Sequence, residues 1–339
     1  MQDFCKIIFY KGVFLMKKIA RTIISILIVA ALAVNLGVCS FAKDKLVYTC
    51  LGDSNAAGYG TTDYVYSRIP APNAYHSLVA EGLNAELRDF GGGGYRTFEI
   101  RYMLDPDYEM DWAYAEICNG DVDKDQMDVY KNDYIKAVED ADYITIQVGS
   151  NDIMGDDLGF AMFELYTPVQ EIEDLKAQLD GTGYFDETLL KVLDALATTV
   201  QYVKFAASFY TRVQQSYIEF YDNWDAIIKN IYRLNPDAKI IALSAINSFN
   251  NTSLLEGSPI KTFKFLDIIF NKLNDWIENG SEYADTYEYC DISDLVFGEL
   301  AITQPDFWDV YLPKVHPTDE QHIEITKRIL AIIEADQAA

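Results

Sequence analysis

The sequence predicts an α/β fold, with a parallel sheet covered by helices on both of its faces. Two observations support this prediction. Short, continuous apolar runs recur along the chain, and such runs are typical of strands buried on both faces. Helical patterns separate these runs. Alternating strands and helices are joined by right-handed crossovers, so we expect a three-layer α/β/α sandwich.

Five apolar runs are predicted to form the strands of this sheet. The run Ile-Thr-Ile-Gln-Val at 144–148 shows the continuous apolar character expected of a strand that is covered on both faces. The predicted strands span residues 46–51, 86–90, 143–148, 239–245 and 286–292.

Helical patterns occupy the intervals between most of the strands, and a last helix follows the fifth strand. The predicted helices span residues 74–83, 132–139, 220–234, 260–279 and 319–334.

The stretch 155–216 departs from this alternation. It is long, aromatic and helix-patterned, it is interrupted at Gly181-Thr182-Gly183, and it contains no convincing strand. We therefore expect a helical cap inserted into one domain that spans residues 43–339.

The first 42 residues have the pattern of a secretory signal peptide. They carry a net charge of +4, and no charged residue occurs from Thr22 to Ala42. Small residues precede a cleavage position after Ala42, so we expect a secreted protein. An uncleaved membrane anchor is the alternative, because the uncharged stretch is about long enough to span a bilayer. Lipidation at Cys39 is disfavoured, since Val38 stands where a small residue is needed.

The chain is strongly acidic, with 53 Asp and Glu residues against 27 Lys and Arg residues and a net charge of −26. Removal of the cationic residues 1–42 would leave a mature chain at −30, four units more negative. Such a surface repels phosphate groups, which excludes nucleic acid and anionic membrane surfaces as partners. Half of the residues are apolar, which excludes a disordered chain.

Three cysteines remain beyond the signal peptide: Cys50, Cys118 and Cys290. This odd, sparse set offers no disulfide framework, and we expect Cys50 and Cys290 to be buried thiols because they lie in strand-like runs. The sequence has no Cys-x-x-Cys motif and no Cys/His cluster with zinc spacing. We therefore expect no metal and no other cofactor.

The acidic segment Asp121–Asp125 has part of the spacing of a calcium-binding loop. Such a loop needs glycine at its sixth position and Glu at its twelfth, where this chain has Gln126 and Asn132. We therefore favour a solvated acidic turn.

Three of the predicted strands run into polar or glycine-rich segments. These segments are Gly52-Asp53-Ser54, Gly91-Gly92-Gly93-Gly94 and Gly149-Ser150-Asn151-Asp152. In an open parallel sheet, ligands bind outside the carboxyl ends of the strands. The three segments therefore predict a site at this edge.

Ser54 would project its hydroxyl into this crevice, with its backbone N–H free to donate to an oxyanion near a helix start. Asn151 could aim a neutral amide at the same charge. Each has a plainer explanation, which is an N-capped turn for Ser54 and turn chemistry for Asn151. A phosphate-binding loop is excluded because no Lys-Ser/Thr pair follows Gly94.

His316 is the histidine best placed to act as a general base. Pro317 holds it in an extended loop, and the capping-box spacing of Thr318 and Gln321 starts the last helix just after it. We expect the other two histidines, His76 and His322, to be packing residues, because both lie inside helical patterns.

The three segments at the strand ends and the pair His316-Pro317 together resemble the four sequence blocks of the SGNH/GDSL hydrolase superfamily, in order and in spacing. The resemblance covers residues 45–335. The resemblance implies a flavodoxin-like five-stranded parallel sheet of order 2-1-3-4-5. It also implies a serine esterase in which Ser54 is the nucleophile and His316 its base. The oxyanion hole would then consist of the N–H groups of Ser54 and Gly94 and the side chain of Asn151.

The chain departs from the family pattern near its histidine. The family usually has Asp three residues before the catalytic His, and this position is Pro313. The imidazole of a catalytic histidine needs a hydrogen-bond acceptor for its Nδ1–H, because this acceptor keeps the hydrogen on Nδ1 and leaves Nε2 free to act as the base. Asp309, Asp306 and a backbone carbonyl are the candidates. A smaller departure is Gln321, where the family often has glycine.

These observations predict a secreted serine esterase that works through an acyl-enzyme. We expect a short acyl ester, such as an O-acetyl group on a glycan, because aromatic residues make up 14% of the chain and can stack on sugars. A lipid esterase or lysophospholipase is one alternative. The other, suggested by Pro313, is a non-catalytic carbohydrate- or cell-wall-binding protein on a decayed hydrolase scaffold.

Overall fold

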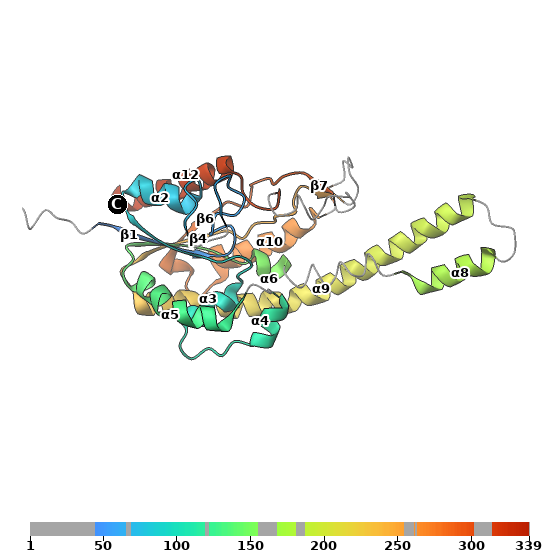
Figure 1. The fold of residues 1–339 in the computed structure, drawn as a ribbon, viewed down its shortest axis with the longest axis horizontal. Helices are drawn as coiled ribbons and strands as arrows, with labels where there is room; N and C mark the ends of the chain where they lie inside the picture. The colour runs from blue at the N-terminus through green and yellow to red at the C-terminus, as the bar shows by residue number, and fades with distance from the viewer. Residues whose placement is uncertain are drawn as a thin grey trace, which may run out of the picture. The chain divides into compact units, whose positions relative to one another are not determined.

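A five-stranded parallel sheet lies between layers of helices (Figure 1). The computed structural model describes residues 45–65, 69–118, 122–154, 168–180, 187–253, 261, 263–301 and 314–338. The strands of the sheet are β1 (Val47–Gly52), β2 (Glu86–Gly91), β3 (Tyr143–Gln147), β4 (Lys239–Leu243) and β6 (Tyr287–Cys290).

The strand order is β2-β1-β3-β4-β6, and every pairing is parallel. The predicted α/β class is therefore confirmed. The fifth place of the expected order 2-1-3-4-5 belongs to β6, because β5 (Thr252–Ser253) pairs with β7 (Leu300–Ala301) in a small second sheet.

The register of β1 aligns the ends of three strands. Gly52 of β1 lies opposite Gly91 of β2 and opposite Gln147 of β3. The segments that follow these strands therefore begin side by side at one edge of the sheet.

Each face of the sheet carries its own hydrophobic cluster, because successive side chains of a strand point to opposite faces. Tyr48 and Cys50 of β1 contribute to one cluster, and Leu51 contributes to the other. The face of Tyr48 is covered by α2 (Tyr75–Leu83) and α12 (Asp319–Ala338). The opposite face is covered by α3 (Thr97–Leu104), α5 (Lys124–Glu139), α9 (Glu187–Leu234) and α10 (Leu266–Asp275) (Figure 1).

Several helices were missed or predicted too short. The sequence did not predict α3, α4 (Trp112–Cys118) or α6 (Ser150–Met154). After α10 the chain continues as a π-helical turn, Trp276–Gly280, and then as a 3₁₀ turn, Ala284–Thr286. The helix predicted over 132–139 begins at Lys124. Its N-cap is Asp123, whose carboxylate accepts the N–H groups of Asp125 and Gln126 at 2.9 and 3.3 Å. In the described part of the acidic segment, Asp123 thus caps a helix.

The region predicted as a cap contains α8 (Gln170–Asp180) and the beginning of α9. Here the structure differs from the prediction, because α9 runs for 48 residues without a boundary at residue 216 and includes the helix expected over 220–234. The predicted break at Gly181-Thr182-Gly183 lies outside the described residues.

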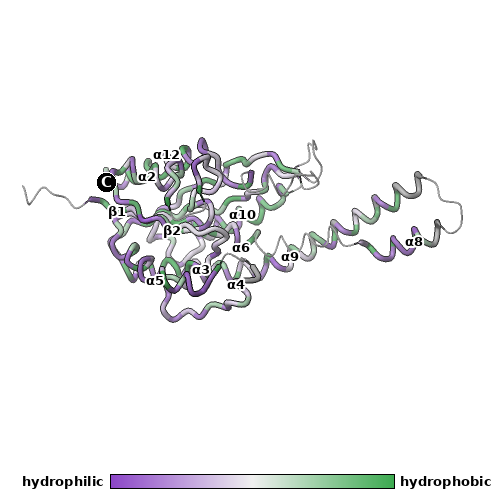
Figure 2. The backbone as a smooth tube through the Cα atoms, viewed as in Figure 1, coloured by the Kyte–Doolittle hydropathy of each residue, from purple (hydrophilic) through white to green (hydrophobic). Residues whose placement is uncertain are grey.

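The two ends of α9 pack differently. Phe220 and Trp224 are buried in the large cluster under the sheet. Near the start of the helix, Leu193 instead packs with Ile172 of α8 in a separate small cluster. Between these ends, buried apolar side chains recur every four residues, at Phe205, Phe209, Val213 and Tyr217. Hydrophobic and hydrophilic residues also follow one another along the part of α9 that is visible beside its label (Figure 2). The amphipathic pattern is therefore continuous, although the partner changes.

The predicted signal peptide, residues 1–42, lies outside the described residues. Within the part of the chain that the structure describes, no helix combines the length and the apolar character needed to cross a membrane.

Candidate active site

Ser54 follows β1 in a loop whose shape depends on glycine. Gly52, Gly58 and Gly60 have φ angles of 147°, 85° and 90°, which favour glycine. A Cβ atom at Gly52 would lie 2.0 Å from the carbonyl oxygen of Gln147. The tight turn therefore places Ser54 at the carboxyl edge of the sheet.

The Ser54 hydroxyl lies 2.8 Å from Nε2 of His316. Both residues are buried, each with 8% of its surface exposed. His316 lies just ahead of α12, which has the predicted capping box. The Thr318 N–H donates to Gln321 Oε1 at 2.9 Å, and the Gln321 N–H donates to Thr318 Oγ1 at 3.4 Å. The cap fixes the start of α12 and thus the loop that carries His316.

Tyr59 and Gly60 pack against His316 from the Ser54 loop. A Cβ atom at Gly60 would lie 2.4 Å from the carbonyl oxygen of Pro317 and 2.8 Å from Cβ of His316. The centroid of the Tyr59 ring lies 5.2 Å from that of His316, and the Tyr59 N–H donates to the Ser54 carbonyl at 3.0 Å. These two residues therefore position the histidine relative to the serine.

The glycine-rich loop after β2 lies directly against the Ser54 loop. The Gly92 N–H donates to the carbonyl of Gly52 at 3.0 Å. A Cβ atom at Gly91 would lie 2.3 Å from the backbone nitrogen of Ala57. A side chain at position 91 would thus force the two loops apart.

Gly94 and Asn151 occupy neighbouring segments at the same edge. Gly94 has a φ of 71°, and Asn151 lies in the first turn of α6. The amide Nδ2 of Asn151 donates to the carbonyl of Tyr95, the residue after Gly94, at 3.0 Å. An amide nitrogen carries two hydrogens, so Asn151 can donate a second bond. The structure therefore brings together the segments of Ser54, Gly94 and Asn151.

Two carboxyl groups stand beside these segments, that of Asp53, which is buried, and that of Asp152, which is half-buried. Asp53 Oδ1 accepts the N–H of Asn55 at 2.9 Å, and Oδ2 has no hydrogen-bond partner among the described residues. Burial raises the pKa of Asp53 to about 7. Asp152 accepts the backbone N–H of Thr97 at 3.1 Å as well as its hydroxyl, and burial raises the pKa of Asp152 to about 6. Asp152 thereby ties α6 to the start of α3.

The segment predicted to supply the acceptor for Nδ1 of His316 lies outside the described residues, and it includes Asp306, Asp309 and Pro313. The pairing of His316 with Asp309, with Asp306 or with a backbone carbonyl stays a prediction.

The other two histidines are buried, as expected of packing residues. Nδ1 of His322 accepts the Tyr75 N–H at 3.2 Å, and burial lowers the pKa of His322 to about 4. His76 lies in α2 with Nδ1 2.8 Å from the carbonyl oxygen of Ala56. Cys50 and Cys290 are free, buried thiols, again as expected.

A cavity of about 350 Å³ lies next to the glycine-rich loop. Its lining includes Gly91, Gly92 and Gly93 and also Tyr59, which contacts His316. Its polar groups include Gln126 and Asp89. Aromatic rings form much of its wall: Tyr59, Tyr64, Phe90, Tyr95, Tyr130 and Tyr134.

Sequence reasoning missed three residues of this site. Tyr59 belongs to no motif. Asp152 was given no role, although its place directly after Asn151 was a usable signal. Arg96 follows the glycine-rich segment. Its guanidinium is buried 3.2 Å from the Glu99 carboxylate and 4.1 Å from the centroid of the Phe98 ring, so its charge is both paired and stacked.

Comparison with known proteins gives one match to a family model. The model of the GDSL-like lipase/acylhydrolase family matches residues 50–322. No curated protein sequence matches the chain.

Among solved structures, the chain is similar to a phospholipase A1 from Streptomyces albidoflavus NA297, with 15% identity and a TM-score of 0.48, over 85% of this chain and 99% of that one. The lipase Lip_vut3 from a goat rumen metagenome has 17% identity and a TM-score of 0.45, over 85% and 97%. A carbohydrate esterase family 2 enzyme from Corynascus thermopiles (Myceliophthora fergusii) has 12% identity and a TM-score of 0.42, over 87% and 67%.

Proposed function

Because the chain belongs to the GDSL-like lipase/acylhydrolase family and is therefore an ester-hydrolysing serine hydrolase, we propose that it cleaves a short acyl ester of a glycan with Ser54 as its nucleophile and His316 as its base. One observation carries the assignment of the residues. The Ser54 hydroxyl lies 2.8 Å from Nε2 of His316, within reach of direct proton transfer.

The reaction follows from this contact. His316 accepts the hydroxyl proton as Ser54 Oγ attacks the ester carbonyl, and the carbonyl oxygen becomes an oxyanion. The N–H groups of Ser54 and Gly94 and the amide of Asn151 donate to this oxyanion. His316 then gives its proton to the leaving alcohol. Water, activated by the same imidazole, releases the acid and restores the Ser54 hydroxyl.

The aromatic cavity supports a glycan as the alcohol part of the substrate. A tyrosine ring has an apolar face and a polar hydroxyl, and a sugar ring likewise has C–H faces and hydroxyl edges. Polar groups such as Gln126 add hydrogen-bonding capacity to this wall. A long fatty acyl chain would be better matched by a wall dominated by aliphatic residues.

Export of the protein is a further part of the proposal. Residues 1–42 have the charge and hydrophobicity of a signal peptide, and glycan esters of cell walls lie outside the cell. Protein recovered from the culture medium should begin at Lys43. An N-terminus at or before residue 16 on membrane-bound protein would favour the uncleaved anchor instead.

The decisive assay follows hydrolysis of p-nitrophenyl acetate, acetylated xylan oligosaccharides and a lysophospholipid by residues 43–339. We expect acetate release from the first two substrates and its loss in Ser54→Ala, with a matched Ser77→Ala variant on α2 fully active. Activity unchanged in Ser54→Ala would reject the nucleophile. Fatty acid release from the lysophospholipid without acetate release would favour the lipid esterase. A folded wild-type protein that is inert on all three would favour the non-catalytic binding protein.

A further inference from the structure

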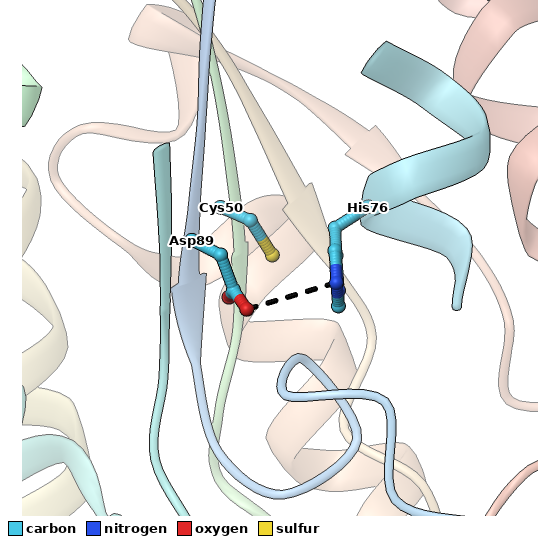
Figure 3. A group of neighbouring side chains, drawn as sticks. All are labelled: Cys50, His76 and Asp89. Atoms are coloured by element: carbon cyan, nitrogen blue, oxygen red, sulfur yellow. Dashed lines mark ion pairs between the residues drawn. The ribbon is translucent and has the colours of Figure 1, made fainter. Parts of the chain in front are cut away.

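Three side chains that could bind a metal meet next to the Ser54 loop, outside the proposed catalytic machinery. They are Cys50 of β1, His76 of α2 and Asp89 of β2 (Figure 3). One ligand atom from each, a thiol sulfur, an imidazole nitrogen and a carboxylate oxygen, lies within 4.8 Å of the other two. Cys50 and His76 are fully buried.

The hydrogen bonding of His76 leaves a lone pair directed at this group. Nδ1 lies 2.8 Å from the carbonyl oxygen of Ala56, and a carbonyl oxygen only accepts, so Nδ1 carries the hydrogen. In the neutral ring, Nε2 is then an acceptor. It lies 3.6 Å from Asp89 Oδ2, a second acceptor, and makes no hydrogen bond to any described residue. A buried imidazole nitrogen and a half-buried carboxylate oxygen that face each other as acceptors call for a positive charge between them.

We propose that a zinc ion, Zn²⁺, supplies this positive charge. Its ligands would be Sγ of Cys50, Nε2 of His76 and the carboxylate of Asp89. Sulfur, imidazole and carboxylate are the ligand types that zinc takes in proteins. Binding releases the Cys50 thiol proton to solvent, so the sulfur coordinates as a thiolate.

The surroundings match the outer contacts expected of zinc ligands. Histidine ligands of zinc usually donate their other N–H to a carbonyl or carboxylate, and ligating carboxylates accept hydrogen bonds in turn. His76 donates to Ala56, and Asp89 Oδ1 accepts the N–H of Gly91 at 3.1 Å. Both outer contacts are therefore present.

Access to the ion comes from the aromatic cavity. Asp89 lines this cavity, and 15% of its side chain is exposed, whereas the His76 side chain is fully buried. Three protein ligands with one open side leave a fourth position for water from the cavity. Ala56 lies in the Ser54 loop and Gly91 begins the glycine-rich loop, so the ion would clamp both loops together.

The test uses residues 43–339 treated with a chelator and then titrated with Zn²⁺, or with Co²⁺ as a spectroscopic probe. We expect one ion per chain, a thiolate-to-cobalt charge-transfer band, and a melting temperature that rises with Zn²⁺ concentration. Cys50→Ser and Asp89→Asn should weaken binding at least about 100-fold. The matched variant Cys290→Ser, which removes the other buried thiol outside the cluster, should retain the band.

Asp89→Asn keeps an oxygen that can accept from Gly91, so it serves as a second variant should Cys50→Ser fail to fold. Folded wild-type protein that binds no stoichiometric metal would overturn the proposal. Equal metal affinity of wild-type protein and folded Asp89→Asn would overturn it as well.

Discussion

The hydroxyl of Ser54 and Nε2 of His316 lie 2.8 Å apart although 262 positions separate them in the sequence. The sheet explains this proximity. Ser54 follows β1, which lies between β2 and β3 in the sheet, at the carboxyl end of the strand. His316 lies just ahead of α12, which packs with α2 on one face of the same sheet. Gly60 lets the two loops approach at backbone distance. The contact between these two side chains is therefore a product of the tertiary fold, and the catalytic role proposed for it can be tested at several points.

Replacing His316 with Gln should abolish proton transfer while it preserves a polar side chain of similar size. We expect kcat on p-nitrophenyl acetate to fall by about 10³-fold or more, with little change in KM and in melting temperature. The matched variant is His322→Gln, at a buried histidine that accepts the Tyr75 N–H. It should lower the melting temperature and leave kcat nearly unchanged. The reverse pattern in the two variants would show that His322 is the base.

Alanine at Gly60 should displace His316. The residue has a φ of 90°, and the added Cβ would lie 2.8 Å from Cβ of His316. Gly58→Ala is matched in backbone strain, with a φ of 85°, but its Cβ would meet Ala74 instead. Both variants should lose about 1–3 kcal/mol of unfolding free energy. Only Gly60→Ala should also lower kcat by about 10-fold or more at temperatures where it is folded, and equal kcat values would contradict this positioning role.

Removing the amide of Asn151 should weaken binding of the oxyanion. We expect Asn151→Ala to lower kcat by about 10²- to 10³-fold with KM changed little, because the oxyanion exists only after attack. Asn235→Ala is the matched control, since the Asn235 amide also donates to backbone carbonyls, at Val138 and Ala141, but not at the active edge. It should lower the melting temperature alone. A raised KM with unchanged kcat in Asn151→Ala would instead assign the amide to substrate binding.

The buried carboxyl of Asp53 should make stability depend on pH. Burial raises the pKa of Asp53 to about 7, so the folded state holds this proton more tightly than the unfolded state. The contribution of Asp53 to stability is therefore favourable at low pH and is lost as pH rises from about 4 to about 7. The melting temperature of Asp53→Asn, minus that of the wild type, should increase across this range. A difference independent of pH would show that Asp53 remains charged in the folded protein.

Much of the fold could be predicted because its strands are continuous apolar runs. β1 and β3 are buried on both faces and carry few polar residues, which makes them easy to identify. α3 and α4 are short and mix aromatic with charged side chains, so no clear period identified them. For α9, the apolar stripe continues while its partner changes from α8 to the sheet, and the sequence shows the stripe but not the partner.

The candidate site was predictable to the extent that it lies in short segments at strand ends. Ser54, Gly94, Asn151 and His316 each follow a strand or precede a helix, where local sequence signals are strong. The group of Cys50, His76 and Asp89 could not be found in this way. The three residues have no zinc spacing, and only the pairing of β1 with β2 and the packing of α2 bring them together.

The position of His316 just ahead of α12 also bears on when activity can arise. During synthesis the Ser54 loop emerges well before His316, the proposed base, and before α12, the helix that fixes its loop. A nascent chain shorter than 316 residues holds a serine with no imidazole to activate it. With His316 as the proposed base, hydrolysis therefore reports that the Ser54 loop and the loop ahead of α12 have both folded onto one sheet.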